Sequence, residues 1–209
     1  MNIKVCGITQ LRQLQELDGT GIDFVGLNFY NQSPRYVIGK ISAAEVADLD
    51  LDIRKVGVFV NESVNQVMKI AEEYGLDVVQ LHGDETPDYC RRLSEEVEVI
   101  KTFRVANGNT SIEKLIENYD DACDYYLFDT DRKGNYGGSS AQFDWGLLAN
   151  SSIEKPFFLA GGIGLHDVVK VKTFNHPDLF AVDINSKFEI SPGVKDIDLV
   201  KMFAHVLRN

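Results

Sequence analysis

The 209-residue sequence is poor in cysteine, with only Cys6, Cys90 and Cys123 and no C-x-x-C pair among them. An odd, widely spaced set of cysteines is unusual in a secreted domain held by disulfides, so we expect free thiols and a cytoplasmic location. A chain of this length buries about 70% of its unfolded surface. Its core therefore needs neither a disulfide nor a structural metal.

Long hydrophobic runs and excess positive charge are also missing. The first residues contain no signal-peptide-like apolar stretch, and the longest uncharged apolar stretch, residues 156–165, is about half of what a membrane-spanning helix needs. The 21 Lys and Arg against 32 Asp and Glu give a net charge of −11. This balance argues against a nucleic-acid or membrane partner, but it permits a small anionic substrate at a locally positive site.

The sequence does contain short apolar runs that alternate with segments of helical period. The runs, rich in β-branched and aromatic residues, predict strands at residues 3–6, 24–29, 55–60, 78–81, 97–103, 125–128, 156–160 and 179–184. Spacing and capping residues predict helices at 9–17 (capped by Thr9), 42–49, 63–75, 86–93, 109–119, 144–148, 166–174 and 196–207. Without any linker, this pattern predicts one α/β domain over residues 1–209, a (β/α)8 TIM barrel, with an open doubly wound sheet as the alternative.

Candidate site residues follow the predicted strands, where barrels of this kind carry their chemistry. Cys6 ends the first run beside Gly7, where the start of a helix can lower the pKa of a thiol; a buried structural cysteine is the alternative. Asp129 and Asp183 end the sixth and eighth runs, either as general acids or as turn caps. A thiol with one or two carboxyls suits proton transfer on a carbonyl compound or sugar.

Glycines after the late strands suggest a phosphate site. Gly137-Gly138 follows the sixth run, Gly161-Gly162 the seventh and Asn185-Ser186 the eighth, as in barrels that bind phosphate there. A dinucleotide site is disfavoured, because the fingerprint lacks its third glycine. Metal-site and hydrolase patterns are absent, and of the four histidines only His82 follows a predicted strand, so we expect no metal.

Taken in order, these stretches resemble the phosphoribosylanthranilate isomerase family along essentially the whole chain. The matching stretches are residues 4–9 (KVCGIT), 26–30 (GLNFY), 33–37 (SPRYV), 58–61 (VFVN), 80–83 (QLHG), 128–130 (FDT), 137–138 (GG), 143–145 (FDW), 159–162 (LAGG), Asp183 and 191–196 (SPGVKD). Singly each stretch is modest, but in this order and spacing they are highly specific.

The resemblance implies a cofactor-free Amadori rearrangement of a phosphosugar by a monomer or homodimer, in tryptophan biosynthesis. It makes Cys6 the general base at sugar C2, Asp129 the general acid at the ring oxygen, and Arg35 the ligand of the anthranilate carboxylate. The remaining substrate-binding residues that it implies are Gln80, His82 and Asp183, with the phosphate on the backbone near Gly138, Gly161, Gly162 and Ser186.

Three positions depart from the family pattern. Ser140 stands where glycine is usual, residues 163–167 read IGLHD, and Lys187 replaces a glycine of the expected phosphate loop. The Lys187 ammonium can reach the phosphate or pair with Glu189. Two other functions are weighed against the isomerase: a metal-dependent phosphosugar epimerase, which would need more His and Asp at strand ends, and a barrel that only binds phosphorylated ligands.

Overall fold

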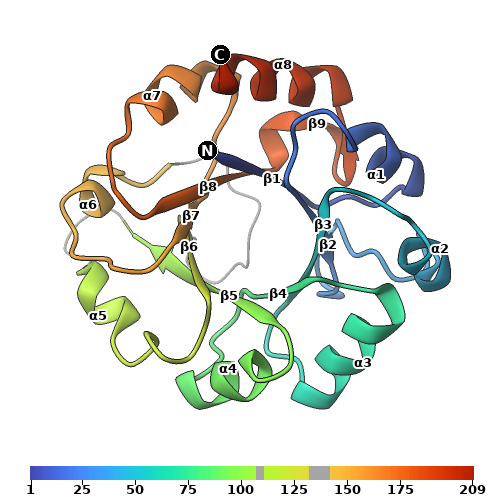
Figure 1. Cartoon of the computed structure of the whole chain (residues 1–209), viewed down its shortest axis with the longest axis horizontal. Coiled ribbons are helices and arrows are strands. Elements are labelled where there is room, and N and C mark those ends of the chain that lie inside the picture. Colours follow the sequence, from blue (N-terminus) through green and yellow to red (C-terminus); the bar gives the residue numbers. More distant parts are fainter. Residues whose placement is uncertain (107–110, 132–141) are drawn as a thin grey trace.

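The computed structural model describes residues 1–106, 111–131 and 142–209. Eight parallel strands pair in sequential order, and β8 pairs with β1 to close a barrel (Figure 1). The strands are β1 (Asn2–Cys6), β2 (Phe24–Asn28), β3 (Arg54–Phe59), β4 (Val78–Leu81), β5 (Glu98–Val105), β6 (Tyr125–Thr130), β7 (Phe157–Leu159) and β8 (Leu179–Ile184). The predicted TIM barrel is confirmed, and the open-sheet alternative is excluded.

Helices form a ring around the barrel, with the C-terminal helix packed between the first and the seventh (Figure 1). They are α1 (Leu11–Leu17), α2 (Ala43–Ala47), α3 (Val64–Tyr74), α4 (Pro87–Ser94), α5 (Ile112–Ile116), α6 (Gly146–Ala149), α7 (Val168–Thr173) and α8 (Ile197–Arg208). The side chains of Ser63, Thr86 and Asp196 cap α3, α4 and α8 by accepting a backbone N–H.

Some local predictions fail. Thr9 does not cap α1, because its hydroxyl donates instead to the Gly193 carbonyl at 2.7 Å; the helix begins two residues later, at Leu11. The predicted helix at 166–174 begins as a short 3-10 helix, η1 (Leu165–Asp167), before α7. A second 3-10 helix, η2 (Ser186–Phe188), and an antiparallel hairpin of β9 (Glu189–Ser191) and β10 (Val194–Lys195) follow β8 and were not predicted.

The barrel interior is layered by the two-residue period of its strands. A plug of buried apolar side chains fills the lower part of the barrel: Phe24, Val56, Val78, Ile100, Leu127, Phe158 and Ala181. Two residues further along several of these strands stand the pocket residues, for example Gln80 after Val78 and Asp129 after Leu127. The plug is therefore the floor of a polar site at the carboxyl end of the strands.

In the described parts of the chain, none of the helices combines the length and the apolar character that crossing a bilayer requires.

Candidate active site

One pocket at the carboxyl end of the strands brings the candidate residues together. Nine of the ten predicted site residues line it, together with side chains from the loop after β2, and with its open mouth it encloses about 740 Å³. The nine are Cys6, Arg35, Gln80, His82, Asp129, Gly161, Gly162, Asp183 and Ser186. The tenth, Gly138, lies outside the described residues, as does Ser140.

Cys6 ends β1 with its sulfur beside Gly26 of β2. A Cβ atom on Gly26 would lie 2.8 Å from Cys6 Sγ, so the absence of a side chain there makes room for the sulfur. The expected lowering of the thiol pKa is wrong: burial raises the pKa of Cys6, and the Lys4 ammonium is the strongest influence that opposes this rise. Such a thiol is hard to ionise, but its thiolate is a strong base.

Lys4 is fully buried inside the barrel, and its Nζ lies 3.0 Å from Oδ1 of Asp183. The two residues are direct neighbours in the β1–β8 register. Burial acts to lower the pKa of Lys4, but the Asp183 carboxylate and the Cys6 thiol outweigh burial and raise it. The lysine therefore keeps its positive charge directly beneath the pocket.

Arg35 is held by a buried network of polar and charged side chains from the segment after β8. Its Nε and Nη2 donate to the two carboxylate oxygens of Glu189, at 2.8 and 2.6 Å. Lys195 Nζ donates to the same Glu189 at 2.8 Å and to Asn185 Oδ1 at 2.7 Å. Glu189 thus occupies the bidentate side of the Arg35 guanidinium, which leaves Nη1 without a partner among the described residues.

His82 and Asp129 face each other across the pocket. The Gln80 amide nitrogen lies 3.0 Å from His82 Nδ1, and since this nitrogen only donates, Nδ1 accepts and the imidazole proton sits on Nε2. That Nε2 is buried, lies 3.6 Å from Asp129 Oδ2, and has no hydrogen-bond partner among the described residues. Burial and nearby cations, Lys101 first among them, lower the pKa of His82 to about 3, so the ring is neutral at neutral pH.

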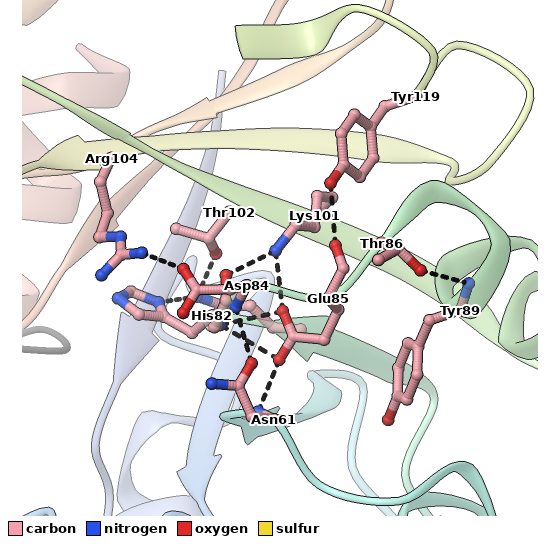
Figure 2. A network of polar contacts seen from close by, with 12 residues as sticks. Asn61, His82, Asp84, Glu85, Thr86, Tyr89, Lys101, Thr102, Arg104 and Tyr119 are labelled. Atoms are coloured by element: carbon pink, nitrogen blue, oxygen red, sulfur yellow. Dashed lines mark hydrogen bonds and ion pairs between the residues drawn. The ribbon is translucent and has the colours of Figure 1, made fainter.

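The loop that carries His82 is fixed by a buried ion pair between Lys101 and Glu85 (Figure 2). Lys101 Nζ on β5 donates to Glu85 Oε2 and to the Gly83 carbonyl, both at 2.8 Å. The other oxygen of Glu85 accepts the backbone N–H of Asn61, which ties the loop after β4 to the loop after β3. His82 is therefore presented by a rigid loop.

The glycine loop after β7 and the helix η2 form the end of the pocket expected to hold phosphate. Gly161 and Gly162 have φ of +94° and +65°, a backbone conformation that favours glycine. Lys187 is exposed, and its φ is not positive, so lysine replaces the family's glycine without strain. Glu189, the partner in the alternative interpretation of Lys187, is bonded to Arg35 and Lys195 instead.

Sequence reasoning missed the buried charges that support these residues. Lys4, Glu189 and Lys195 are buried or nearly so and are all ion-paired. Lysine side chains are usually exposed, so the presence of a lysine in an apolar run does not by itself predict a buried role inside a barrel. The even spacing of Lys4 and Cys6 on one strand was the available signal, because residues two apart share a face.

Comparisons with known proteins identify the family of the chain. The family model described as "N-(5'phosphoribosyl)anthranilate (PRA) isomerase" matches residues 3–206. The N-(5'-phosphoribosyl)anthranilate isomerase of Parabacteroides distasonis is 40% identical over 205 residues, covering 97% of this chain and 91% of that protein.

Solved structures extend the similarity to three dimensions. Monomers generated from the dimeric phosphoribosylanthranilate isomerase of Thermotoga maritima give a TM-score of 0.80 at 33% identity, covering 100% of this chain and 98% of that one. A phosphoribosyl anthranilate isomerase in complex with reduced 1-(o-carboxyphenylamino)-1-deoxyribulose 5-phosphate gives the same TM-score, identity and coverage. The family match, the whole-chain identity and the shared barrel agree, and the chain belongs to the N-(5'-phosphoribosyl)anthranilate isomerase family.

Proposed function

We propose that this chain isomerises N-(5'-phosphoribosyl)anthranilate to 1-(2-carboxyphenylamino)-1-deoxyribulose 5-phosphate by general acid–base catalysis, in tryptophan biosynthesis. The observation that carries the mechanism is one pocket lined by a thiol, a carboxyl and an arginine: Cys6, Asp129 and Arg35. The product class is that of the reduced compound bound to the related enzyme.

Asp129 acts first, as the acid. Its carboxyl gives a proton to the furanose ring oxygen, the bond between that oxygen and C1 breaks, and the anthranilate nitrogen forms a Schiff base with C1. Its Oδ1 accepts the Thr130 N–H at 2.8 Å, and Oδ2 faces the neutral His82. This arrangement holds the carboxyl in one orientation, as a general acid requires.

Cys6 acts second, as the base. The thiolate removes the proton from C2, the C–H electron pair forms a C1=C2 double bond, and the imine electrons move to the nitrogen. Loss of the proton on the C2 hydroxyl and protonation of C1 give the ketone. The substrate's own nitrogen is the electron sink, so the reaction as proposed uses no cofactor.

Binding uses the ends of the pocket. Arg35 offers Nη1 and its charge to the anthranilate carboxylate, and Gln80, His82 and Asp183 face the sugar. The phosphate lies against the backbone of Gly161 and Gly162, before η1, and of Ser186 at the start of η2, which all line the pocket.

The three cysteines are free thiols, which suits a reducing compartment. A cytoplasmic location and a monomer or homodimer complete the proposed function.

A turnover assay with the purified chain tests this function. Cys6→Ser and Asp129→Asn should each lower kcat by at least about 100-fold with an unchanged fold, because each removes one proton-transfer group. Cys90→Ser is the matched control: Cys90 is equally buried but lies on α4, outside the pocket, so kcat should persist. A parent chain that binds substrate without turnover would make it a binding protein, and near-normal kcat in either site variant would remove that residue from the mechanism.

A further inference from the structure

The charges around the Cys6 sulfur are unbalanced. Charged groups that are buried or nearly so interact with it or with one another nearby: Lys4 on β1, Asp183 on β8, Arg35 on the loop after β2, and the Glu189–Lys195 pair on β9 and β10. Across the pocket stand the neutral His82 and Asp129, and β2 contributes only Gly26. At neutral pH, three cations against two carboxylates leave this group of five with one positive charge, which an anion at Cys6 would match. Burial lowers the pKa of Lys195 to about 8, so its charge is lost above that pH.

Lys4 is the cation best placed to act on the sulfur. It lies two residues before Cys6 on the same strand, so both side chains point into the barrel. Arg35 and Lys195 share Glu189, which neutralises much of their charge. Lys4 has no solvent around it to screen its field, and among the charged neighbours it has the largest effect on the Cys6 thiol.

Resting on the proposed role of Cys6 as the base, we propose that Lys4 is a positioning residue for catalysis: its buried ammonium stabilises the thiolate form of the Cys6 sulfur, so that a thiolate can form in the pocket when the base is needed. Asp183 restrains this effect, because its carboxylate shares the ammonium and repels the sulfur anion. When the thiolate takes the C2 proton from the sugar, the sulfur becomes neutral and Lys4 keeps its own proton. The lysine therefore acts through Cys6 and never touches the reacting atoms.

The two partners of this ion pair should have opposite effects on the sulfur. We would measure the rate at which iodoacetamide alkylates Cys6 between pH 7 and 10, quantified on the Cys6 peptide by mass spectrometry. Lys4→Met should slow alkylation at pH 8 by about tenfold or more, since an adjacent opposite charge shifts a pKa by about one to three units. Asp183→Asn should accelerate alkylation about threefold or more, because it removes the competing carboxylate.

Lys101→Met is the matched control. Lys101 is another buried strand lysine in an ion pair, 2.8 Å from Glu85, but it sits on β5 and contacts the His82 loop rather than Cys6 (Figure 2). Its removal should leave the Cys6 alkylation rate within twofold of the parent. Alkylation at the parental rate in Lys4→Met, or a change of the same direction in Lys4→Met and Asp183→Asn, would overturn the proposal. If Lys4→Met does not fold, Asp183→Asn alone tests the proposal, because a Cys6 alkylation rate that is not accelerated in Asp183→Asn also overturns the proposal.

The alkylation test needs no substrate, so it separates this inference from the proposed function. An inactive parent with the expected alkylation pattern would refute the isomerase and leave the Lys4 effect standing. An active parent without that pattern would refute the Lys4 effect alone. In an active enzyme, the acid limb of the kcat/KM profile of Lys4→Met should move to higher pH by the same amount as its alkylation profile.

Discussion

Arg35 shows how one side chain divides its hydrogen-bonding capacity between the fold and the pocket. Two of its nitrogens are committed to Glu189, and the residue is only 8% exposed. A carboxylate in the pocket would meet Nη1 and the positive charge, without the two parallel hydrogen bonds that make arginine a strong clamp. The guanidinium must therefore span two carboxylates at once.

Arg35→Lys should raise KM for the phosphoribosyl substrate about tenfold or more, because a lysine cannot hold Glu189 and reach the substrate together. Steady-state kinetics with a thermal melt would measure both effects. The control is Arg54→Lys, which breaks a similar forked pair with Glu98 outside the pocket and should leave KM unchanged. Lower thermal stability with an unaltered KM would show that Arg35 serves the fold alone.

Lys187 offers a second test at the residue scale. If its ammonium reaches the phosphate, Lys187→Ala should raise KM by roughly 5–100-fold at low salt, with a much smaller change in kcat. This rise in KM should be smaller in 0.5 M salt, because the electrostatic screening length is only about 4 Å at that ionic strength. Lys201→Ala, an exposed lysine on α8, is the control. A KM within twofold of the parent would leave the phosphate to the backbone.

Strands were more predictable than their neighbours in this chain, for physical reasons. Buried parallel strands are continuous apolar runs, so all eight were found to within two residues at each end. The failed Thr9 cap depends on Gly193, 184 residues away, and such a contact leaves no local signal. The β9–β10 hairpin is too short for an alternating pattern, yet it supplies Glu189 and Lys195 to the site.

Gly26 on β2 gives a prediction for the strand pair β1–β2. Gly26→Ala should lower kcat at least about tenfold, because its Cβ would press on the Cys6 sulfur and backbone, and small displacements of a reacting group are costly. Gly57→Ala on β3 is the matched control: its Cβ would meet Leu76 and Phe59, away from the pocket. It should cost about 1–3 kcal/mol of stability with little change in kcat. Equal kcat in the two variants would contradict the close fit between β1 and β2.

In the whole molecule, the apolar residues that stabilise the barrel and the polar residues of the pocket lie at different depths along the barrel axis. The apolar plug and most of the layer between strands and helices are uncharged, and the ionised groups of the pocket gather above the plug; the buried Lys101–Glu85 pair is an exception outside the pocket. Family and fold were readable from sequence because they depend on the order of apolar runs and on strand-end residues. The charge balance was not, since it arises only when strands distant in sequence meet.

His82 links this layered interior to acid stability. Its folded pKa of about 3 lies below the ordinary value of 6.5, so between these values the unfolded chain binds a proton that the folded chain refuses. Stability is therefore lost as pH falls, by about 2 kcal/mol between pH 6 and 4.5 from this residue. Denaturant unfolding at both pH values should show that His82→Gln loses about 2 kcal/mol less unfolding free energy between pH 6 and 4.5 than the parent. His205→Gln, on the exposed face of α8, should lose as much as the parent. Identical losses in parent and His82→Gln would contradict a neutral His82.

The pairing of β1 with β8 has a consequence for synthesis. The ribosome makes β1 first and its closing partner last, with about 170 residues between them. At typical elongation rates of about 5–20 residues per second, the outer edge of β1 stays open for roughly 10–35 s, with unpaired N–H and C=O groups that can join a foreign strand. Lys4 on β1 disfavours such pairing, because burying its charge is costly until β8 has been made and Asp183 can form the ion pair with it.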